Sequence, residues 1–428
     1  MTKLVLPFAI SLAAFALPTM GGSRAWESGL KHEQTPTHGA SESITVDAAG
    51  FAIPNVADND TEHLAKRYFA VKPGQGTTPT FLWPDRTVSF CFETQAGRDI
   101  MIRHLENAIT AWVAAGLTSE VYRYREVAEP GESCTSYHER WKTLVIRHND
   151  DGLHVTTVGL WPLDSTKPDY RGPTMDISTR SDVAHLNVLA NFAHELGHAW
   201  GLYHEHQNPF FWSPPYYNLA MPGSGDYTPL GGKVFGDHFD CFALRDYHTA
   251  VTKVKNHPRF ANDPAGMAKE IADLCVNAKV ARDYGFSAGD WLPLLYQAAY
   301  SSPGVRHMNA NSEQVDWDSI MIYASGSGGM GYARPAKSAE ENSEDYDKRQ
   351  PVLLRNDGLK IKSNSKPSKG DVAGIRKMYE DSSYAEGYGT IDNLKVPLLT
   401  DKKSTHWTEF MKNVALKTKK SCQNLVGS

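Results

Sequence analysis

The segment His194 to His204 constrains this chain more than any other part of it, because it reads His-Glu-Leu-Gly-His-Ala-Trp-Gly-Leu-Tyr-His. On a helix, His194 and His198 are four residues apart, so both imidazoles project from one face and can share one metal ion. Glu195 lies between them, where a general base can take a proton from metal-bound water. Gly201 can adopt the left-handed conformation that ends a helix, which returns the chain and brings in His204 as a third ligand. Three histidines and a water leave an open position, which is typical of a catalytic zinc site.

A bare His-Glu-x-x-His also occurs in ordinary amphipathic helices, so the motif has a structural alternative. The added Gly201 and His204 at fixed offsets favour the zinc site over that alternative. A second signal is the segment Ser319-Ile320-Met321-Ile322-Tyr323. Taken alone it is typical of a short buried strand, but beside the long histidine motif it has a second interpretation as part of the same site.

The chain resembles the astacin family of the metzincin zinc proteases in four places. The third histidine is followed at once by glutamate, Ser319 to Tyr323 resembles the family's methionine turn, and Leu82-Trp83-Pro84 opens the first expected strand. The segment from Pro367 to Ile375, followed by Tyr379, resembles the family's C-terminal helix, with Ser368 and Asp371 spaced as a capping box.

The sequence departs from the family at other positions. Leu202 stands where phenylalanine is usual, and Ile322 replaces the usual histidine of the methionine turn. The run after Glu205, His-Gln-Asn-Pro, lacks the common arginine and aspartate. The resemblance is therefore to a divergent, astacin-like metzincin.

The resemblance implies a secreted zinc metalloendopeptidase, made as a zymogen, that hydrolyses peptide bonds in protein or peptide substrates. It implies one catalytic zinc ion on His194, His198 and His204, with Glu195 as general base. Met321 would form the floor under the histidines, and Tyr323 would act as a further zinc ligand that swings away to stabilise the oxyanion. The alternatives are a metzincin of another subfamily, or a non-catalytic binding protein that retains the fold. The intact Glu195 argues against the second, because loss of that base is the simplest way to lose the chemistry.

The N-terminus predicts export and processing. Lys3 precedes an apolar run from Leu4 to Leu17, which indicates a signal peptide at 1–22, although cleavage after Ala16 or Ala25 fits as well. A membrane anchor is the weaker interpretation, since the run is short and contains Pro7. Residues 23–67 are expected to form a propeptide, with the sequon Asn59-Asp60-Thr61, that ends at the dibasic pair Lys66-Arg67 and is removed by a kexin-like protease.

The charge and the cysteine count indicate which partners and which redox environment to expect. A net charge of −5 gives no reason to expect nucleic acid or an anionic membrane as a partner. Five cysteines in an exported chain allow two disulfides and one remaining thiol. We expect Cys91 to pair with Cys134 and Cys241 with Cys275, which leaves Cys422.

The fold expected for residues 68–381 is an α+β, metzincin-type catalytic domain with a mixed twisted sheet and an active-site helix from about Leu186 to Tyr203. Helical spacing of apolar residues places an earlier helix around 102–112. The expected strands lie at 87–93, 121–127, 144–148, 155–160 and 174–178. In metzincins the strand bordering the cleft is antiparallel, and 174–178 is the candidate for it.

The lower half is expected to be enlarged by a helical insertion at about 209–315, because a loop of that length without structure would be unusual. Its helices are predicted at 239–256 and 264–284. Residues 382–428 form a C-terminal tail with lysine clusters and no strong periodicity.

Overall fold

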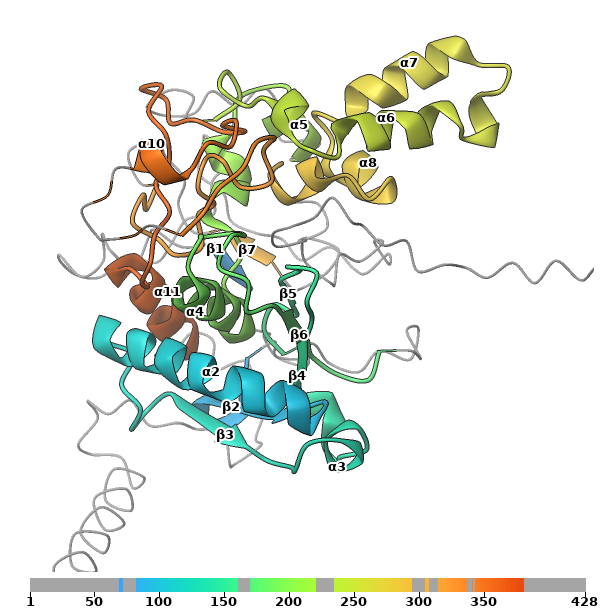
Figure 1. Cartoon of the computed structure of the whole chain (residues 1–428). Coiled ribbons are helices and arrows are strands. Elements are labelled where there is room, and N and C mark those ends of the chain that lie inside the picture. Colours follow the sequence, from blue (N-terminus) through green and yellow to red (C-terminus); the bar gives the residue numbers. More distant parts are fainter. Residues whose placement is uncertain are drawn as a thin grey trace, which may run out of the picture.

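The computed structural model describes residues 69–71, 82–160, 170–220, 235–294, 305–307, 315–335, 337, 341 and 343–380. The predicted signal peptide at 1–22, propeptide at 23–67 and tail at 382–428 lie outside these residues. The same holds for the dibasic pair, the sequon and Cys422. The described residues form a mixed α+β structure in which a five-stranded sheet lies beside several helices (Figure 1).

Four strands of the sheet are parallel and one edge strand is antiparallel. In spatial order the strands are β3 (Arg123–Glu126), β2 (Thr87–Phe92), β4 (Leu144–His148), β6 (Thr174–Ile177) and β5 (Val155–Thr156). All five lie within the ranges predicted from the sequence. The mixed sheet is therefore confirmed.

The prediction that 174–178 is the antiparallel edge strand is wrong. β6 runs parallel to β4 and lies inside the sheet, whereas β5 is antiparallel to β6 and forms the edge. The alternation of buried and half-buried residues along β6 resembles that of an edge strand. Side-chain periodicity reports which face of a strand is buried and carries no information on which strand lies beside it.

Two long helices pack against each other, α2 (Gln95–Ala115) and α4 (Val188–Trp200) (Figure 1). The side chain of Thr94 caps α2 by accepting a hydrogen bond from Gly97 N. The Trp112 indole of α2 donates to Ala193 O of α4 at 2.9 Å. Helical spacing in the sequence favours a buried stripe of Ile102, Leu105, Ile109 and Trp112. Leu105 and Trp112 are buried, but Met101 and Ala108 are buried in place of Ile102 and Ile109, which are only partly buried.

The segment at about 209–315, called the insertion below, contains helices where they were predicted, but the second predicted helix consists of two. They are α7 (Pro264–Asp273) and α8 (Ala278–Asp283), which begins where the Asn277 side chain accepts hydrogen bonds from Lys279 N and Val280 N. The first predicted helix corresponds to α6 (Tyr247–Lys255). With α5 (Tyr216–Ala220) these helices surround a second hydrophobic core, separate from the core under the sheet.

Both predicted disulfides are present. Cys91 of β2 is bonded to Cys134 of the short helix α3 (Glu132–Thr135), with a Cα–Cα distance of 5.6 Å. Cys241 is bonded to Cys275, just after α7, with a Cα–Cα distance of 5.7 Å. The second bridge ties the start of the helical insertion to its middle.

A two-stranded sheet that the sequence did not indicate joins β1 (Phe69–Val71) to β7 (Val305–His307). β1 also lies against the turn after α4: Val71 N donates to Gly201 O at 2.8 Å, and Tyr203 N donates to Phe69 O at 2.7 Å. The chain that follows the predicted propeptide is thus paired with the turn that leads to His204.

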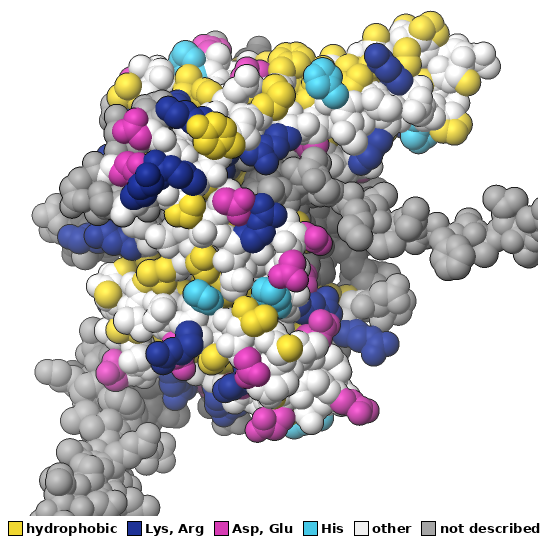
Figure 2. Space-filling view, viewed as in Figure 1, with side chains coloured by type: hydrophobic (Ala, Val, Ile, Leu, Met, Phe, Trp, Pro, Cys, Tyr) yellow, Lys and Arg dark blue, Asp and Glu magenta, His cyan; other side chains and the backbone are white. Residues whose placement is uncertain are grey.

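The remaining α-helices of the described residues are α10 (Ser343–Tyr346) and α11 (Lys369–Glu380). Basic and acidic side chains are interspersed over the face shown in Figure 2, and hydrophobic side chains gather on the projecting α6–α7 pair. Among the described residues, no helix has the length and apolar character needed to cross a membrane.

Candidate metal centre

Helix α4 presents the first two histidines. It begins after Asn187, whose side chain accepts a hydrogen bond from Ala190 N, so the first turn has the capping that a helix start needs. His194 and His198 follow one turn apart on the buried part of this helix. Their exposed fractions are 2% and 1%. Two buried imidazoles on one helix face are the first half of a metal site.

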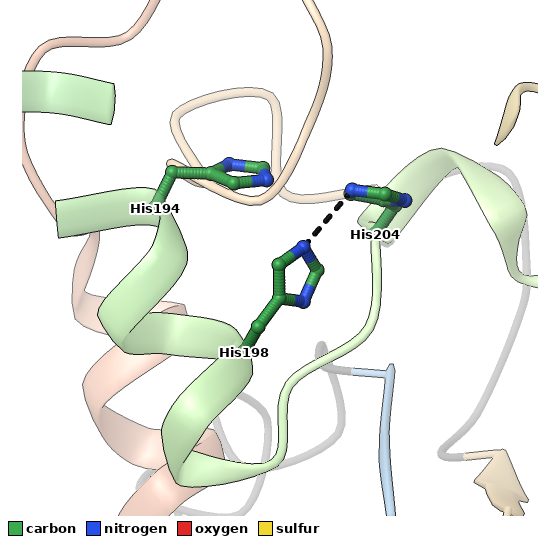
Figure 3. A group of neighbouring side chains, drawn as sticks. All are labelled: His194, His198 and His204. Carbon is green, nitrogen blue, oxygen red and sulfur yellow. Dashed lines mark hydrogen bonds between the residues drawn. The ribbon is translucent and has the colours of Figure 1, made fainter. Parts of the chain in front are cut away.

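A left-handed glycine returns the chain to the helix. Gly201 has φ 111°, and its N–H bonds to the carbonyls of Gly197 and His198 at the end of α4. A Cβ at this position would also lie 2.7 Å from Val71 Cγ2 of β1, so only glycine fits both the backbone and the packing. The turn brings His204 back, and the ligand atoms of the three histidines all lie within 4.8 Å of one another (Figure 3).

Each imidazole is held by its Nδ1 atom. His194 Nδ1 lies 2.7 Å from Ile320 O, His198 Nδ1 lies 2.7 Å from Leu202 O, and His204 Nδ1 lies 2.7 Å from Gln207 Oε1. A carbonyl oxygen can only accept, so Nδ1 carries the proton in all three rings. With Nδ1 used in these hydrogen bonds, Nε2 is the nitrogen that each ring can offer to a metal ion.

The spacing of one nitrogen pair fits a shared ion. His198 Nε2 and His204 Nε2 are 3.1 Å apart (Figure 3). Two nitrogens each about 2.0–2.1 Å from a tetrahedral zinc ion are separated by roughly 3.3 Å. At this distance the two nitrogens can share either a proton, as a hydrogen bond, or a metal ion. The buried His194/His198/His204 group can thus hold a metal ion.

Glu195 is fully buried and lies on α4 next to the first histidine. Its Oε2 accepts a hydrogen bond from the Thr156 hydroxyl of β5. This contact fixes the carboxylate relative to the edge strand. The sequence did not single out Thr156, because nothing local to the histidine motif points to a residue 39 positions earlier in the chain.

Met321 and Tyr323 both lie at the histidines. A Cβ at Gly197 of α4 would collide with Met321 Sδ, so the glycine inside the motif makes room for the methionine. The ring of Tyr323 lies 4.4 Å from that of His204 and 6.0 Å from that of His194, measured between centroids. The turn crosses from one hydrophobic core to the other, since Met321 belongs to the core under the sheet and Tyr323 to the core of the insertion.

The capping box predicted at the start of α11 is present, and its carboxylate also binds the segment that contains Ser319 and Ile320. Asp371 N donates to Ser368 Oγ at 2.9 Å, and Ser368 N donates to the Asp371 carboxylate at 2.8 Å. The same carboxylate accepts from Ser319 Oγ at 2.6 Å and from Ile320 N at 2.9 Å. Because Ile320 O accepts from His194, the cap of α11 holds the backbone that orients the first ligand.

Burial raises the pKa of Asp371 to about 6, and the nearby negative charge of Asp316 acts in the same direction. The hydrogen bonds from Ser319, Ser368 and Ile320 oppose this rise. The carboxyl group is thus a buried acid whose charged form is disfavoured.

Two further histidines adjoin the site. His185 Nε2 lies 3.1 Å from His194 Nδ1, and the ring of His206 stacks on that of His204 at a centroid distance of 5.3 Å. Sequence reasoning missed both as neighbours of the site, although His206 stands two residues after the motif. Comparisons with protein-family models and with curated proteins find no match for this chain.

Proposed function

We propose that this chain is a secreted zinc metalloendopeptidase of the metzincin type, similar to the astacins. The observation that carries the proposal is the convergence of three buried imidazoles, each anchored through Nδ1, two of them on the helix that also carries Glu195. The fit of the 3.1 Å nitrogen spacing to one tetrahedral ion supports zinc. The two disulfides support an oxidising, extracellular environment.

The chain's own residues have separate tasks in peptide hydrolysis. When bound, zinc supplies a Lewis acid that lowers the pKa of water and polarises the substrate carbonyl. Glu195, oriented by Thr156, accepts the proton of the attacking water and returns it to the leaving amine. Tyr323 donates a hydrogen bond to the oxygen on which charge develops. Met321 supports the histidines from below.

Zymogen activation belongs to the same proposal. Cleavage after Arg67 by a kexin-like protease would place the new N-terminus just before β1, which pairs with the turn that leads to His204. Protein or peptide substrates would then enter the freed site.

The test separates metal binding from chemistry by two substitutions in α4. His198→Ala should abolish both stoichiometric zinc and cleavage of a peptide library. Glu195→Gln should keep the zinc and lower turnover by several orders of magnitude, because glutamine has the same shape and cannot accept the proton. Metal analysis measures the zinc content, and a peptide-library assay measures cleavage, in each case on the chain processed at Arg67.

The matched control is Glu106→Gln on the exposed side of α2, which should leave both readouts unchanged. Full zinc occupancy in His198→Ala would contradict the ligand set. Near wild-type proteolysis by Glu195→Gln would contradict the role of Glu195 as general base. A wild-type chain that binds zinc and cleaves no peptide would favour the alternative of a non-catalytic binding protein.

A further inference from the structure

Residues 286–294 of the insertion form hydrogen bonds with the residues that follow the third histidine. Gln207 is buried, with 1% of its surface exposed. Its Nε2 donates to Gly289 O at 3.3 Å and to Leu292 O at 3.1 Å, and its backbone oxygen accepts from Leu294 N at 3.0 Å. Both amide hydrogens are thereby directed at the insertion. This fixes which end of the amide is the oxygen, and Oε1 faces His204 Nδ1.

The same segment holds the neighbouring residue. His206 Nε2 donates to Asp290 O at 3.0 Å, and Nδ1 accepts from Tyr323 N at 3.4 Å. The ring of Trp291 packs against both His206 and Tyr323, with centroid distances of 5.0 and 5.1 Å. Adjacent residues after the motif are therefore anchored to one stretch of the insertion.

We propose that Gln207 is the positioning residue of the third metal ligand, and that the insertion serves to hold Gln207. The inference rests on the proposed zinc site. Hydrogen bonds to the far nitrogen of a ligating histidine fix its tautomer and orientation, and their loss costs metal affinity. His194 and His198 take this support from the backbone carbonyls of Ile320 and Leu202. His204 takes it from a side chain that the insertion orients.

Gln207→Met tests the assignment, because methionine has a similar length and offers no acceptor to His204 Nδ1. The dissociation constant for zinc, measured by chelator competition on the full processed chain, should rise about 10- to 100-fold. The visible d–d absorption of the cobalt(II)-loaded protein should change as well, since that spectrum reports ligand geometry.

The control is Asn208→Ala at the next residue. Asn208 is equally buried, and its Oδ1 accepts from Phe210 N at 3.1 Å without touching a ligand. This substitution should lower the melting temperature of the metal-free chain and leave zinc affinity unchanged. If Asn208→Ala weakens zinc binding as much as Gln207→Met does, local stability explains the effect and the inference fails.

Gln207→Glu provides the rescue. A carboxylate can accept from His204 Nδ1 but cannot donate to the carbonyls of Gly289 and Leu292. Zinc should bind more tightly to Gln207→Glu than to Gln207→Met, although the metal-free Gln207→Glu chain should be no more stable than the metal-free Gln207→Met chain. Equal affinities of the two variants, or wild-type affinity in Gln207→Met, would overturn the inference.

The experiment also separates this inference from the proposed function. A wild-type chain that takes up no zinc overturns both. A wild-type chain that binds zinc without cleaving peptides overturns the peptidase proposal only, and the affinities of the Gln207 variants then still decide the role of Gln207.

Discussion

At the scale of single residues, the ring of Tyr323 is held by packing against other rings, whereas the three histidines are held by hydrogen bonds to Nδ1. Its ring lies against those of His204, His206 and Trp291, and its exposed fraction is 3%. The ring is thus held close to the ligands by a buried aromatic cluster.

Tyr323→Phe should retain zinc and lower kcat about 10²- to 10³-fold, since removal of one oxyanion donor typically has that effect. The ring and its packing are kept, so the melting temperature should change little. Steady-state kinetics on the processed chain measure the loss. Tyr332→Phe, at a tyrosine that is 67% exposed, is the control. An unchanged kcat in Tyr323→Phe would remove the phenol from the mechanism.

At the scale of elements, the first turn of α11 is joined to the methionine turn through one carboxyl group. Asp371 caps the helix and binds Ser319 and Ile320. Its pKa, raised to about 6 by burial and by Asp316, means that the native state binds this proton more tightly than the unfolded chain does. The contribution of Asp371 to the free energy of unfolding is therefore largest below about pH 4 and is lost as the pH rises through about 6.

Asp371→Asn removes this titration. The wild-type chain should lose roughly 3 kcal/mol of unfolding free energy relative to the variant between pH 4 and pH 7, which corresponds to about two pKa units. Urea denaturation of both metal-free chains at several pH values measures the difference. Asp318→Asn, at an exposed acid in the same segment, controls for general charge effects. If the free energy of unfolding varies with pH in the same way for wild type and Asp371→Asn, the raised pKa of Asp371 is contradicted.

At the scale of the whole molecule, the candidate metal centre lies where two hydrophobic cores meet. The core under the sheet contains Met321, and the core of the insertion contains Ile322 and Tyr323. β1 also contributes to this site, because its backbone forms hydrogen bonds with the turn before His204. β1 thus joins the first described residues to the turn that carries His204.

Replacing both Lys66 and Arg67 by Ala should block processing and lower peptidase activity, because the chain before β1 would stay attached beside that turn. Activity of the uncut variant, verified intact by mass spectrometry, is compared with that of processed protein. Equal activity would exclude this cleavage as the activation step.

Glu205 directly follows His204 and is a candidate partner for the ammonium group that cleavage after Arg67 would create at Tyr68. Glu205→Gln in processed protein tests whether the new N-terminus docks on this carboxylate. Glu205 is 3% exposed and already accepts from Asp316 N at 3.3 Å, which is the local alternative to docking. Unchanged activity would favour the local role, in which case the propeptide only blocks the site.

The sequence by itself determined the parts of the protein that depend on local geometry. The i, i+4 spacing of His194 and His198, the left-handed turn at Gly201 and the Ser368–Asp371 capping box follow from the repeat of a helix and from the conformations open to each residue. The strand positions were also predictable, because alternation constrains them. The cysteine count allowed two disulfides without selecting the pairing, and the expected pairs are the ones that the structure contains.

Only the tertiary structure decided which distant groups meet these local elements. The antiparallel edge is β5 instead of β6, Thr156 binds Glu195, Asp371 holds Ile320, and the carbonyls of Gly289 and Leu292 orient Gln207. These partners are separated by 39 to 85 residues in sequence. Many of the acceptors are backbone carbonyls, which every residue type carries, so no pattern of side chains marks them. Their positions are set by how the sheet and the insertion pack around α4.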